Sequence, residues 1–294
     1  MKRHGRRRVH FLMTTTQPKS PSAWEPLTPR GVAAFGRAPF KRLLLVQLIV
    51  AFAAAGSVVW FLERGWFPVV RAAIQALPEQ GEIRGEQLLW PGESPVQLAS
   101  NPFLGVAVDL NHSGQLRSDS HLQIEFGRRD FRVSSILGYK PLDYPAGQTI
   151  DFNRKKLEPW WGAWEPIWAV AAAAATVLGL LVAWSTLATL YCAPIRLITF
   201  LTNRDLNWVQ SWRLAGAVLM PGALFFTAAI LCYTLHWIDL VSLGGAGVLH
   251  IAVGWIYLVL CPWFLPHVTA EGKVSGDPFA AAPPSGTSPP ADLK

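Results

Sequence analysis

The chain has 294 residues, of which 51% are apolar and only 15% are charged, and its mean hydropathy is +0.26. These values exclude an ordinary soluble domain. The chain also contains 14 tryptophans, and tryptophan favours the membrane–water interface. The net charge of +7 lies mainly in residues 1–42, which hold ten Lys and Arg and one acid, whereas residues 63–163 are close to neutral. We therefore predict a lipid bilayer as the environment, with anionic lipid at the basic N-terminal arm and no nucleic acid partner.

Residues 1–42 are predicted to form this basic, largely disordered arm on the cytoplasmic side. They begin like the charged part of a signal peptide, but polar residues and prolines follow where an apolar segment is needed, so no cleaved signal is expected. Met13 is an alternative start to Met1. Residues 14–30 have the composition of a disordered tail.

The first transmembrane helix is predicted at residues 43–62, which contain no charge and one strongly polar side chain, Gln47. A helix of about 20 residues crosses a hydrocarbon core roughly 30 Å thick. Lys41 and Arg42 precede this segment directly. The basic flank predicts an uncleaved anchor with its N-terminus in the cytoplasm.

Residues 63–163 form the longest segment between two predicted spans. Residues 67–77 have helical spacing and end at Pro78. Four runs rich in β-branched, aromatic or aliphatic residues are expected to be short strands, at residues 96–99, 103–110, 122–126 and 131–136. The last two flank the sequence GRRD and predict a β-hairpin. Together these elements predict a small α+β domain.

The second transmembrane helix is predicted at residues 164–191 and is expected to end before Pro194. Its alanine run at residues 169–175 and Gly179 leave a surface of small side chains. Such a surface favours close contact with another helix over contact with lipid.

The third and fourth transmembrane helices are predicted at residues 214–237 and 242–265. The arginines of residues 192–213 assign that loop to the cytoplasm, and residues 266–294 are predicted to be a disordered cytoplasmic tail. The predicted fold class is a mainly α membrane protein with four transmembrane helices. A small α+β extracytoplasmic domain is inserted between helices 1 and 2, and both termini are cytoplasmic.

Several tryptophans lie near the predicted ends of the spans and are expected to be interfacial anchors. They are Trp160, Trp161 and Trp164 at the outer end of the second span, and Trp208 and Trp212 before the third.

Within the predicted spans, Pro221, Gly222 and His250 are the residues of interest. Pro221 predicts a kink, either a fixed bend packed against the alanine-rich second span or a hinge, with the fixed bend preferred. Ionisable residues within spans often have a function. No Asp or Glu lies deep in a span to pair with His250, so a neutral histidine bonded to a backbone carbonyl or to a hydroxyl such as that of Thr227 is favoured.

No motif for catalysis or cofactor binding was found, and we predict neither an enzyme nor a bound cofactor. The sequence from Asp109 to Gly114 resembles the start of a calcium loop, but Ser120 stands where the bidentate Glu belongs. A metal site formed by His112, Asp119 and His121 has no defined ligand spacing. Ser185 lacks a nucleophile motif, and the three cysteines, Cys192, Cys232 and Cys261, are interpreted as packing residues.

Two stretches carry a likeness to known proteins. The first opens the outer domain with Leu77, Pro78, Gly81, Ile83, Gly85, Leu88 and Pro91. The second leads into the third span with Trp208, Arg213, Leu214 and Pro221. These stretches resemble a family of uncharacterised bacterial four-span membrane proteins, some described as maltodextrin utilisation proteins. The resemblance covers roughly residues 40–265 and implies a bacterial inner-membrane protein, without catalytic residues to carry over.

The preferred functional hypothesis is a non-enzymatic inner-membrane protein whose outer domain senses or binds a protein or small-molecule partner. The alternative is a component of a transporter or channel, suggested by the proline and glycine breaks in the third and fourth spans. A membrane-embedded enzyme is the third and least favoured hypothesis.

Overall fold

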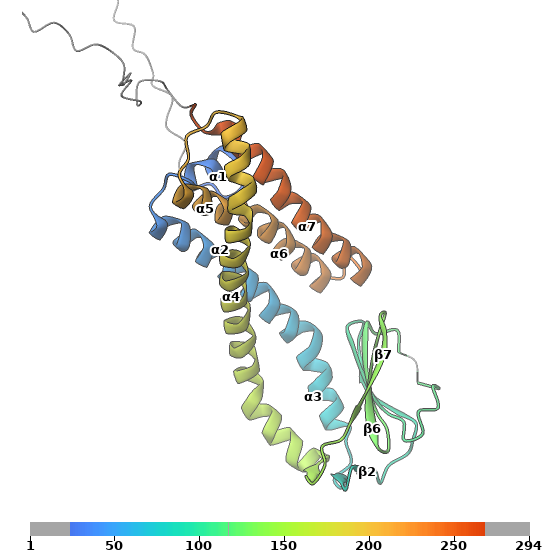
Figure 1. Cartoon of the computed structure of the whole chain (residues 1–294). Coiled ribbons are helices and arrows are strands. Elements are labelled where there is room, and N and C mark those ends of the chain that lie inside the picture. The colour runs from blue at the N-terminus through green and yellow to red at the C-terminus, as the bar shows by residue number, and fades with distance from the viewer. Residues whose placement is uncertain (1–23, 117, 268–294) are drawn as a thin grey trace, which may run out of the picture.

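The computed structural model describes residues 24–116 and 118–267 of the chain. It is mostly helical (58%), with two small sheets and four helical segments long and apolar enough to cross a membrane. Figure 1 shows the helices as an elongated bundle and the sheets at one end of it. The four segments are Phe40–Gln75, Arg154–Leu201, Trp208–Thr234 and Leu240–Phe264.

The first segment is a continuous helical rod made of three elements. Helix α2 (Phe40–Phe61) passes into the π-helical turn η1 (Leu62–Trp66), and η1 continues into α3 (Phe67–Gln75). The rod therefore extends beyond the predicted span of residues 43–62 and includes most of the helix predicted at residues 67–77, which ends at Gln75. It ends before Pro78, as expected because proline has no backbone N–H to donate to a helical hydrogen bond.

Helix α2 lies between the other long helices and contacts both α4 (Arg154–Leu201) and α6 (Met220–Thr234). Helix α5 (Trp208–Ala217) precedes α6, and α7 (Leu240–Leu260) packs on α6 before the 3₁₀ turn η2 (Cys261–Phe264). The best-buried core lies where α1, α5 and η2 meet the long helices. Its larger fully buried side chains are Val32, Phe35, Leu43, Ile195, Leu214, Val218 and Met220.

Part of the predicted disordered arm is folded, which corrects the prediction for residues 1–42. Residues Pro29–Phe35 form helix α1, whose N-terminus is capped by Thr28: its hydroxyl accepts a hydrogen bond from the amide of Gly31 at 3.1 Å. Phe35 is fully buried in the bundle core. A seven-residue helix is too short to be stable alone, so its order depends on this packing. Residues 1–23, including the alternative start at Met13, lie outside the described residues, as do residues 268–294 of the predicted tail.

Helix α4 is far longer than the predicted span of residues 164–191. It has 48 residues and contains Pro159, Pro166 and Pro194, so the expected stop at Pro194 is wrong. Each proline removes one backbone hydrogen bond, but the helix continues past Pro194 because Ile195 and Thr199 are buried in the core. Only residues 202–207 of the predicted loop 192–213 separate α4 from α5.

At 1.5 Å per residue, 48 residues measure roughly 72 Å, more than twice the hydrocarbon thickness of a bilayer. Figure 1 shows α4 bent in its N-terminal part, which lies beside α3 and the sheets. Arg71 of α3 pairs with Glu165 of α4 at 3.4 Å, and the rings of Phe67 and Trp161 meet at 5.5 Å. We call α3 and this part of α4 the stalk.

The sheet domain follows α3 and contains eight strands. A five-stranded sheet has the order β3-β4-β5-β6-β7, and a three-stranded sheet has the order β2-β1-β8. The strands are β1 (Glu82–Arg84), β2 (Gln87–Leu89), β3 (Val96–Ser100), β4 (Leu104–Val108), β5 (Leu122–Phe126), β6 (Asp130–Ser135), β7 (Gly138–Asp143) and β8 (Ile150–Asp151).

The predicted hairpin of β5 and β6 is confirmed, with Phe126 opposite Phe131. Strands β4 and β5 run parallel, which the sequence analysis did not anticipate. One face of the sheet packs on α3, where Val69 and Ala73 meet Leu104 and Val106. The opposite face of β5 and β6 is therefore free to carry polar groups.

Candidate functional site

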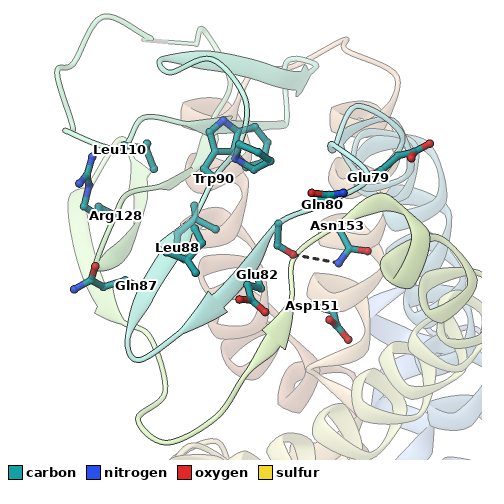
Figure 2. A pocket seen from close by; sticks show the side chains of 13 residues that line it. Glu79, Gln80, Glu82, Gln87, Leu88, Trp90, Leu110, Arg128, Asp151 and Asn153 are labelled. Carbon is teal, nitrogen blue, oxygen red and sulfur yellow. Dashed lines mark hydrogen bonds between the residues drawn. The ribbon is translucent and has the colours of Figure 1, made fainter.

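Several cavities in the sheet domain are lined by clusters of polar side chains. The first, of about 680 Å³, is formed by the three-stranded sheet and by Leu110 and Arg128, which follow β4 and β5 of the five-stranded sheet. Its lining includes Glu79, Glu82, Trp90, Arg128, Asp151 and Asn153. Figure 2 shows these side chains around the opening. Several already stabilise the fold. Asn153 donates to the carbonyl of Gly81 at 3.1 Å and caps α4, and Glu82 pairs with Arg84 at 3.2 Å.

The second cavity is built on a turn that follows β4. The carboxylate of Asp109, 1% exposed, accepts hydrogen bonds from the amide of Ser113 at 2.6 Å, the hydroxyl of Ser113 at 2.7 Å and the amide of Asn111 at 3.2 Å. Burial raises the pKa of Asp109, but these hydrogen bonds outweigh it and leave the pKa below its ordinary value. The turn places His112 in a left-handed conformation, with φ of 49°.

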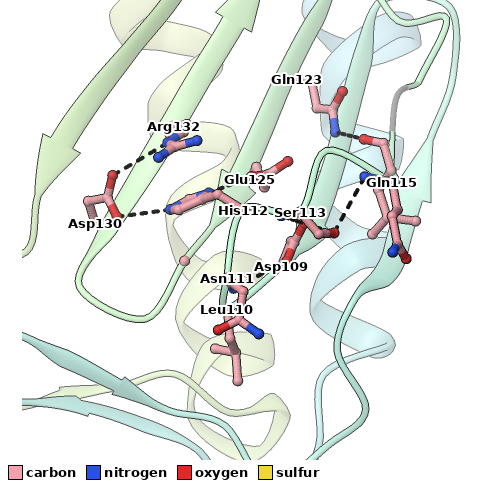
Figure 3. Close-up of polar contacts among 12 residues, drawn as sticks. Asp109, Leu110, Asn111, His112, Ser113, Gln115, Gln123, Glu125, Asp130 and Arg132 are labelled. Atoms are coloured by element: carbon pink, nitrogen blue, oxygen red, sulfur yellow. Dashed lines mark hydrogen bonds and ion pairs between the residues drawn. The ribbon is translucent and has the colours of Figure 1, made fainter.

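This turn directs His112 between two carboxylates of neighbouring strands. Its Nδ1 lies 2.5 Å from Oε1 of Glu125 in β5, and its Nε2 lies 2.9 Å from Oδ1 of Asp130 in β6. Figure 3 shows the imidazole bridging the two strands. Both ring nitrogens are occupied by this arrangement.

The cavity beside His112 measures about 510 Å³ and is lined by polar groups of β5, β6 and β7. The strand register places Glu125 opposite Arg132 and Ser134 opposite Tyr139, on the face that points away from α3. The guanidinium of Arg132 lies 5.5 Å above the ring of Tyr139, and its Nε forms an ion pair with Oδ2 of Asp130 at 3.6 Å (Figure 3). We call this cavity the β5–β7 pocket.

The sheet domain also contacts the ends of two bundle helices. Nδ1 of His121, directly before β5, lies 2.6 Å from the hydroxyl of Tyr233 in α6, and the two rings stack at 5.6 Å. Phe103 packs against Tyr233 at 5.0 Å and against Phe61 of α2 at 5.3 Å. The side chain of Asn101 donates to the carbonyl of Gly65 at 2.6 Å. We call this contact the junction.

Pro221 and Gly222 begin α6 and are buried, and the helix is interrupted before them, between Ala217 and Met220. A Cβ added to Gly222 would lie 2.5 Å from the carbonyl oxygen of His250, so α6 and α7 approach closely here. The bend therefore packs on α7, not on the alanine-rich part of α4 as expected. The structure thus brings together residues singled out separately in the sequence.

The side chain of His250 takes part in this helix contact. Its Nδ1 lies 2.5 Å from the carbonyl oxygen of Gly247, and its ring stacks on Phe226 of α6 at 5.3 Å. The hydroxyl of Thr227 donates instead to Ala223 at 2.8 Å. His250 is thus engaged with a backbone carbonyl, the first of the two arrangements favoured from the sequence.

The tryptophans fall into two groups. Trp160, Trp164 and Trp168 are exposed along one face of α4, with successive rings 6.2 and 6.3 Å apart. Trp161, in contrast, faces α3 in the stalk.

At the opposite end of the bundle, Trp208 is exposed beneath Arg196, with the guanidinium 5.1 Å from the ring. Trp212 donates from Nε1 to the hydroxyl of Thr189 at 3.2 Å.

The weak metal hypotheses find no matching geometry. His112 and His121 belong to the β5–β7 pocket and to the junction, and each has another partner. Among residues 24–116 and 118–267, no group of three His, Cys, Asp or Glu side chains is placed to hold a metal ion. The carboxylate of Asp109, the first residue of the calcium-loop likeness, is used to hold its own turn.

Sequence reasoning missed Glu125, Asp130, Arg132 and Tyr233 as site residues. The alternation in β5 and β6 already placed Glu125 on the face opposite Ile124 and Phe126, so this part could have been found. The junction had no such signal, because His121 and Tyr233 are 112 positions apart.

Comparisons with protein-family models, curated proteins and solved structures find no match to this chain. The function is therefore argued from the pocket, the junction and the helices.

Proposed function

We propose that the chain is a polytopic inner-membrane protein whose sheet domain lies outside the cytoplasm and senses a small polar molecule. One observation carries this proposal. Strand β5 supplies Glu125 to the pocket, and His121, the residue directly before it, bonds to Tyr233 at the end of α6. A ligand that displaces β5 therefore acts on a bundle helix. Membership of the bacterial four-span family that the sequence resembles is part of the same proposal.

Exposed apolar side chains support insertion into a bilayer. Helices α4 and α7 carry bulky apolar side chains on their outer faces. The exposure of such side chains to water is unfavourable. Examples from the two helices are Val170, Leu178, Val182, Leu190, Val248, Ile251 and Ile256. Contact with lipid tails removes this apolar surface from water without a partner protein.

Basic residues support a cytoplasmic location for the end of the bundle at α1 and α5. Arg37 pairs with Asp205 at 3.6 Å, and Arg213 donates to the carbonyl of Ala38 at 2.9 Å. Arg196 and Arg204 donate to carbonyls nearby, those of Leu206 and Leu265. Arginines from separate parts of the chain thus gather at the end opposite the sheet domain, as the positive-inside rule requires.

The pocket favours binding over catalysis. Both nitrogens of His112 already face carboxylates, which leaves neither nitrogen free to accept a proton from a substrate. The charged groups of the lining are balanced by partners, since Glu125 faces His112 at 2.5 Å and Arg132 pairs with Asp130 at 3.6 Å. Ser134 and Tyr139 add hydroxyls to the same lining. Such a lining suits a hydroxylated or zwitterionic small molecule better than a strongly charged one.

A transporter function would use the interruption between α5 and α6. The buried polar side chains near it are bonded to protein, however: Gln47 donates to the carbonyl of Gly216 at 3.3 Å, and Ser211 donates to that of Asn207 at 2.9 Å. Groups bonded in this way do not offer sites to a passing solute. These bonds favour a sensor over a transporter.

The topology can be tested with single cysteines in a chain whose three native cysteines are replaced by alanine. Arg129→Cys lies at the exposed β5–β6 turn, and Asp205→Cys lies in the exposed loop before α5. A membrane-impermeant maleimide is expected to label Arg129→Cys in intact cells and Asp205→Cys only after permeabilisation. The reverse pattern would contradict the proposed orientation.

Ligand binding can be tested by thermal unfolding of the full chain in lipid nanodiscs. The probes are amino acids, monosaccharides, disaccharides and small carboxylates, each added separately. A ligand at about 100 times its Kd stabilises by roughly 2.7 kcal/mol. We expect at least one probe class to raise the Tm of the wild type but not that of Arg132→Ala.

Arg128→Ala is the matched control, because Arg128 lines the other cavity. A ligand that loses its effect in Arg128→Ala but keeps it in Arg132→Ala would move the site to that cavity. If no probe class shifts the wild type, a small-molecule sensor is contradicted.

A further inference from the structure

The turn between β6 and β7 presents two large apolar side chains to the surroundings. Ile136 is 64% exposed and Leu137 is 94% exposed. Gly138, with φ of 112°, closes the turn in a conformation that side chains rarely adopt. The sequence from Ser134 to Tyr139 has no charged residue. We call residues 135–138 the hairpin tip.

The strand register determines where this tip lies. Leu122, at the start of β5, pairs with Ser135, at the end of β6. The tip is therefore at the same end of the sheet as His121, which bonds to Tyr233 near the C-terminal end of α6. Figure 1 shows the tip at the edge of the domain nearest the α6–α7 connection.

That connection is the expected surface of the bilayer. It carries Trp237, which is 74% exposed, and it is followed by the exposed Val241 at the start of α7. Tyr139, also exposed, follows the tip within two residues of Leu137. Aromatic residues beside bulky aliphatic ones are the usual composition of a membrane–water boundary.

From this placement we propose that the hairpin tip inserts Leu137 into the outer leaflet of the bilayer, while Ile136 borders the β5–β7 pocket. The inference rests on the proposed function, because it requires the four helical segments to span the membrane. Insertion removes the Leu137 side chain from water and gives the domain a third attachment besides the stalk and the junction. A domain held at three places can transmit a displacement of β5 instead of rotating about the stalk.

The test places an environment-sensitive NBD fluorophore at single cysteines of the full chain, in the cysteine-free background, in nanodiscs of phosphatidylethanolamine and phosphatidylglycerol. Leu137→Cys reports on the tip. Arg129→Cys, in the turn at the opposite end of β6, reports on the water-facing end of the sheet. Val182→Cys, on the exposed face of α4, is the reference for a position in the bilayer.

We expect NBD at Leu137→Cys and at Val182→Cys to emit at shorter wavelength and to be quenched by doxyl-labelled lipids, while Arg129→Cys shows neither effect. If Val182→Cys is quenched and Leu137→Cys behaves like Arg129→Cys, the tip inference is overturned and membrane insertion of the helices stands. If Val182→Cys itself is not quenched, the membrane topology fails. A blue shift at Leu137→Cys without lipid quenching would assign the tip to a protein contact and also overturn the inference.

Discussion

His121 and Tyr233 are joined by a hydrogen bond of 2.6 Å between Nδ1 and the phenolic hydroxyl, although 112 positions separate them in the chain. His121 lies before β5, which also supplies Glu125 to the polar pocket, and Tyr233 lies in the last turn of α6. The bond therefore connects the two parts of the molecule at a point where no covalent link exists. Phe103 and Asn101 add contacts at the same junction, to Phe61 and to the carbonyl of Gly65, and the covalent connections run through α3 and α4.

The substitution Tyr233→Phe tests this bond while keeping the ring, which stacks on His121 and meets Phe103 edge to face. We expect a loss of about 1 kcal/mol in the free energy of unfolding, measured by denaturant titration in mixed micelles, because one hydrogen bond is removed. Tyr139→Phe is the control, since Tyr139 is exposed on β7. Equal effects of the two substitutions would show that the junction does not stabilise the folded state.

Gly222→Ala tests the close approach of α6 and α7. The added Cβ would lie 2.5 Å from the carbonyl oxygen of His250, and a backbone atom cannot rotate away. We expect destabilisation of about 1–3 kcal/mol, typical of overpacking. Gly244→Ala in α7 is the control: no atom lies within 4 Å of its added Cβ, and alanine favours the helix by up to about 1 kcal/mol. If Gly222→Ala is neutral as well, the two helices separate more readily than this contact implies.

Ser113→Ala tests the turn that presents His112. The pKa of Asp109 is lowered in the folded protein, so its ionised form stabilises the fold at pH values above the ordinary pKa of about 3.9 and loses this effect as the pH falls through the lower, folded-state pKa. Removing the Ser113 hydroxyl is expected to cost roughly 1.5–3 kcal/mol at pH 7, as for a hydrogen bond to a charged group.

This cost is expected to shrink as the pH is lowered below about 4, because the protonated carboxyl no longer gains from the donor. Unfolding titrations of the wild type and of Ser113→Ala at pH 7, 5 and 3 measure the difference. Ser100→Ala, at the exposed end of β3, should show no such pH dependence. A difference that stays constant with pH would mean that Ser113 acts independently of the Asp109 charge.

We expect aromatic packing in the stalk to contribute more to the free energy of unfolding than its ion pair does. Phe67 is buried against Trp161, and its replacement by alanine should cost about 3–5 kcal/mol. The side chains of Arg71 and Glu165 are partly exposed, and Arg71→Ala should cost less than about 1 kcal/mol. Comparing the two variants by the same unfolding measurement separates the contributions, and a larger loss for Arg71→Ala would reverse this ranking.

The sequence predicted some elements well because their signals are local. Twenty or more apolar residues in succession indicate a possible span whatever their neighbours are, and the four apolar helices are present. The hairpin of β5 and β6 also follows from a local pattern, two alternating runs around the turn at Arg128 and Arg129. The expected stop at Pro194 failed because burial of Ile195 and Thr199 outweighs the hydrogen bond that proline removes.

Helix α1 was missed for the same reason. A helix of seven residues is stable only when it packs against the surrounding core, and that core is not visible in the local sequence. By itself, the sequence determined that the chain has four apolar helical segments, a mixed domain between the first two, and a positive charge concentrated in the N-terminal arm. The tertiary structure alone decided that β4 and β5 run parallel, that His112 lies between Glu125 and Asp130, and that His121 meets Tyr233. These contacts join residues distant along the chain, and their positions depend on how strands and helices pack, which hydropathy and local periodicity do not encode.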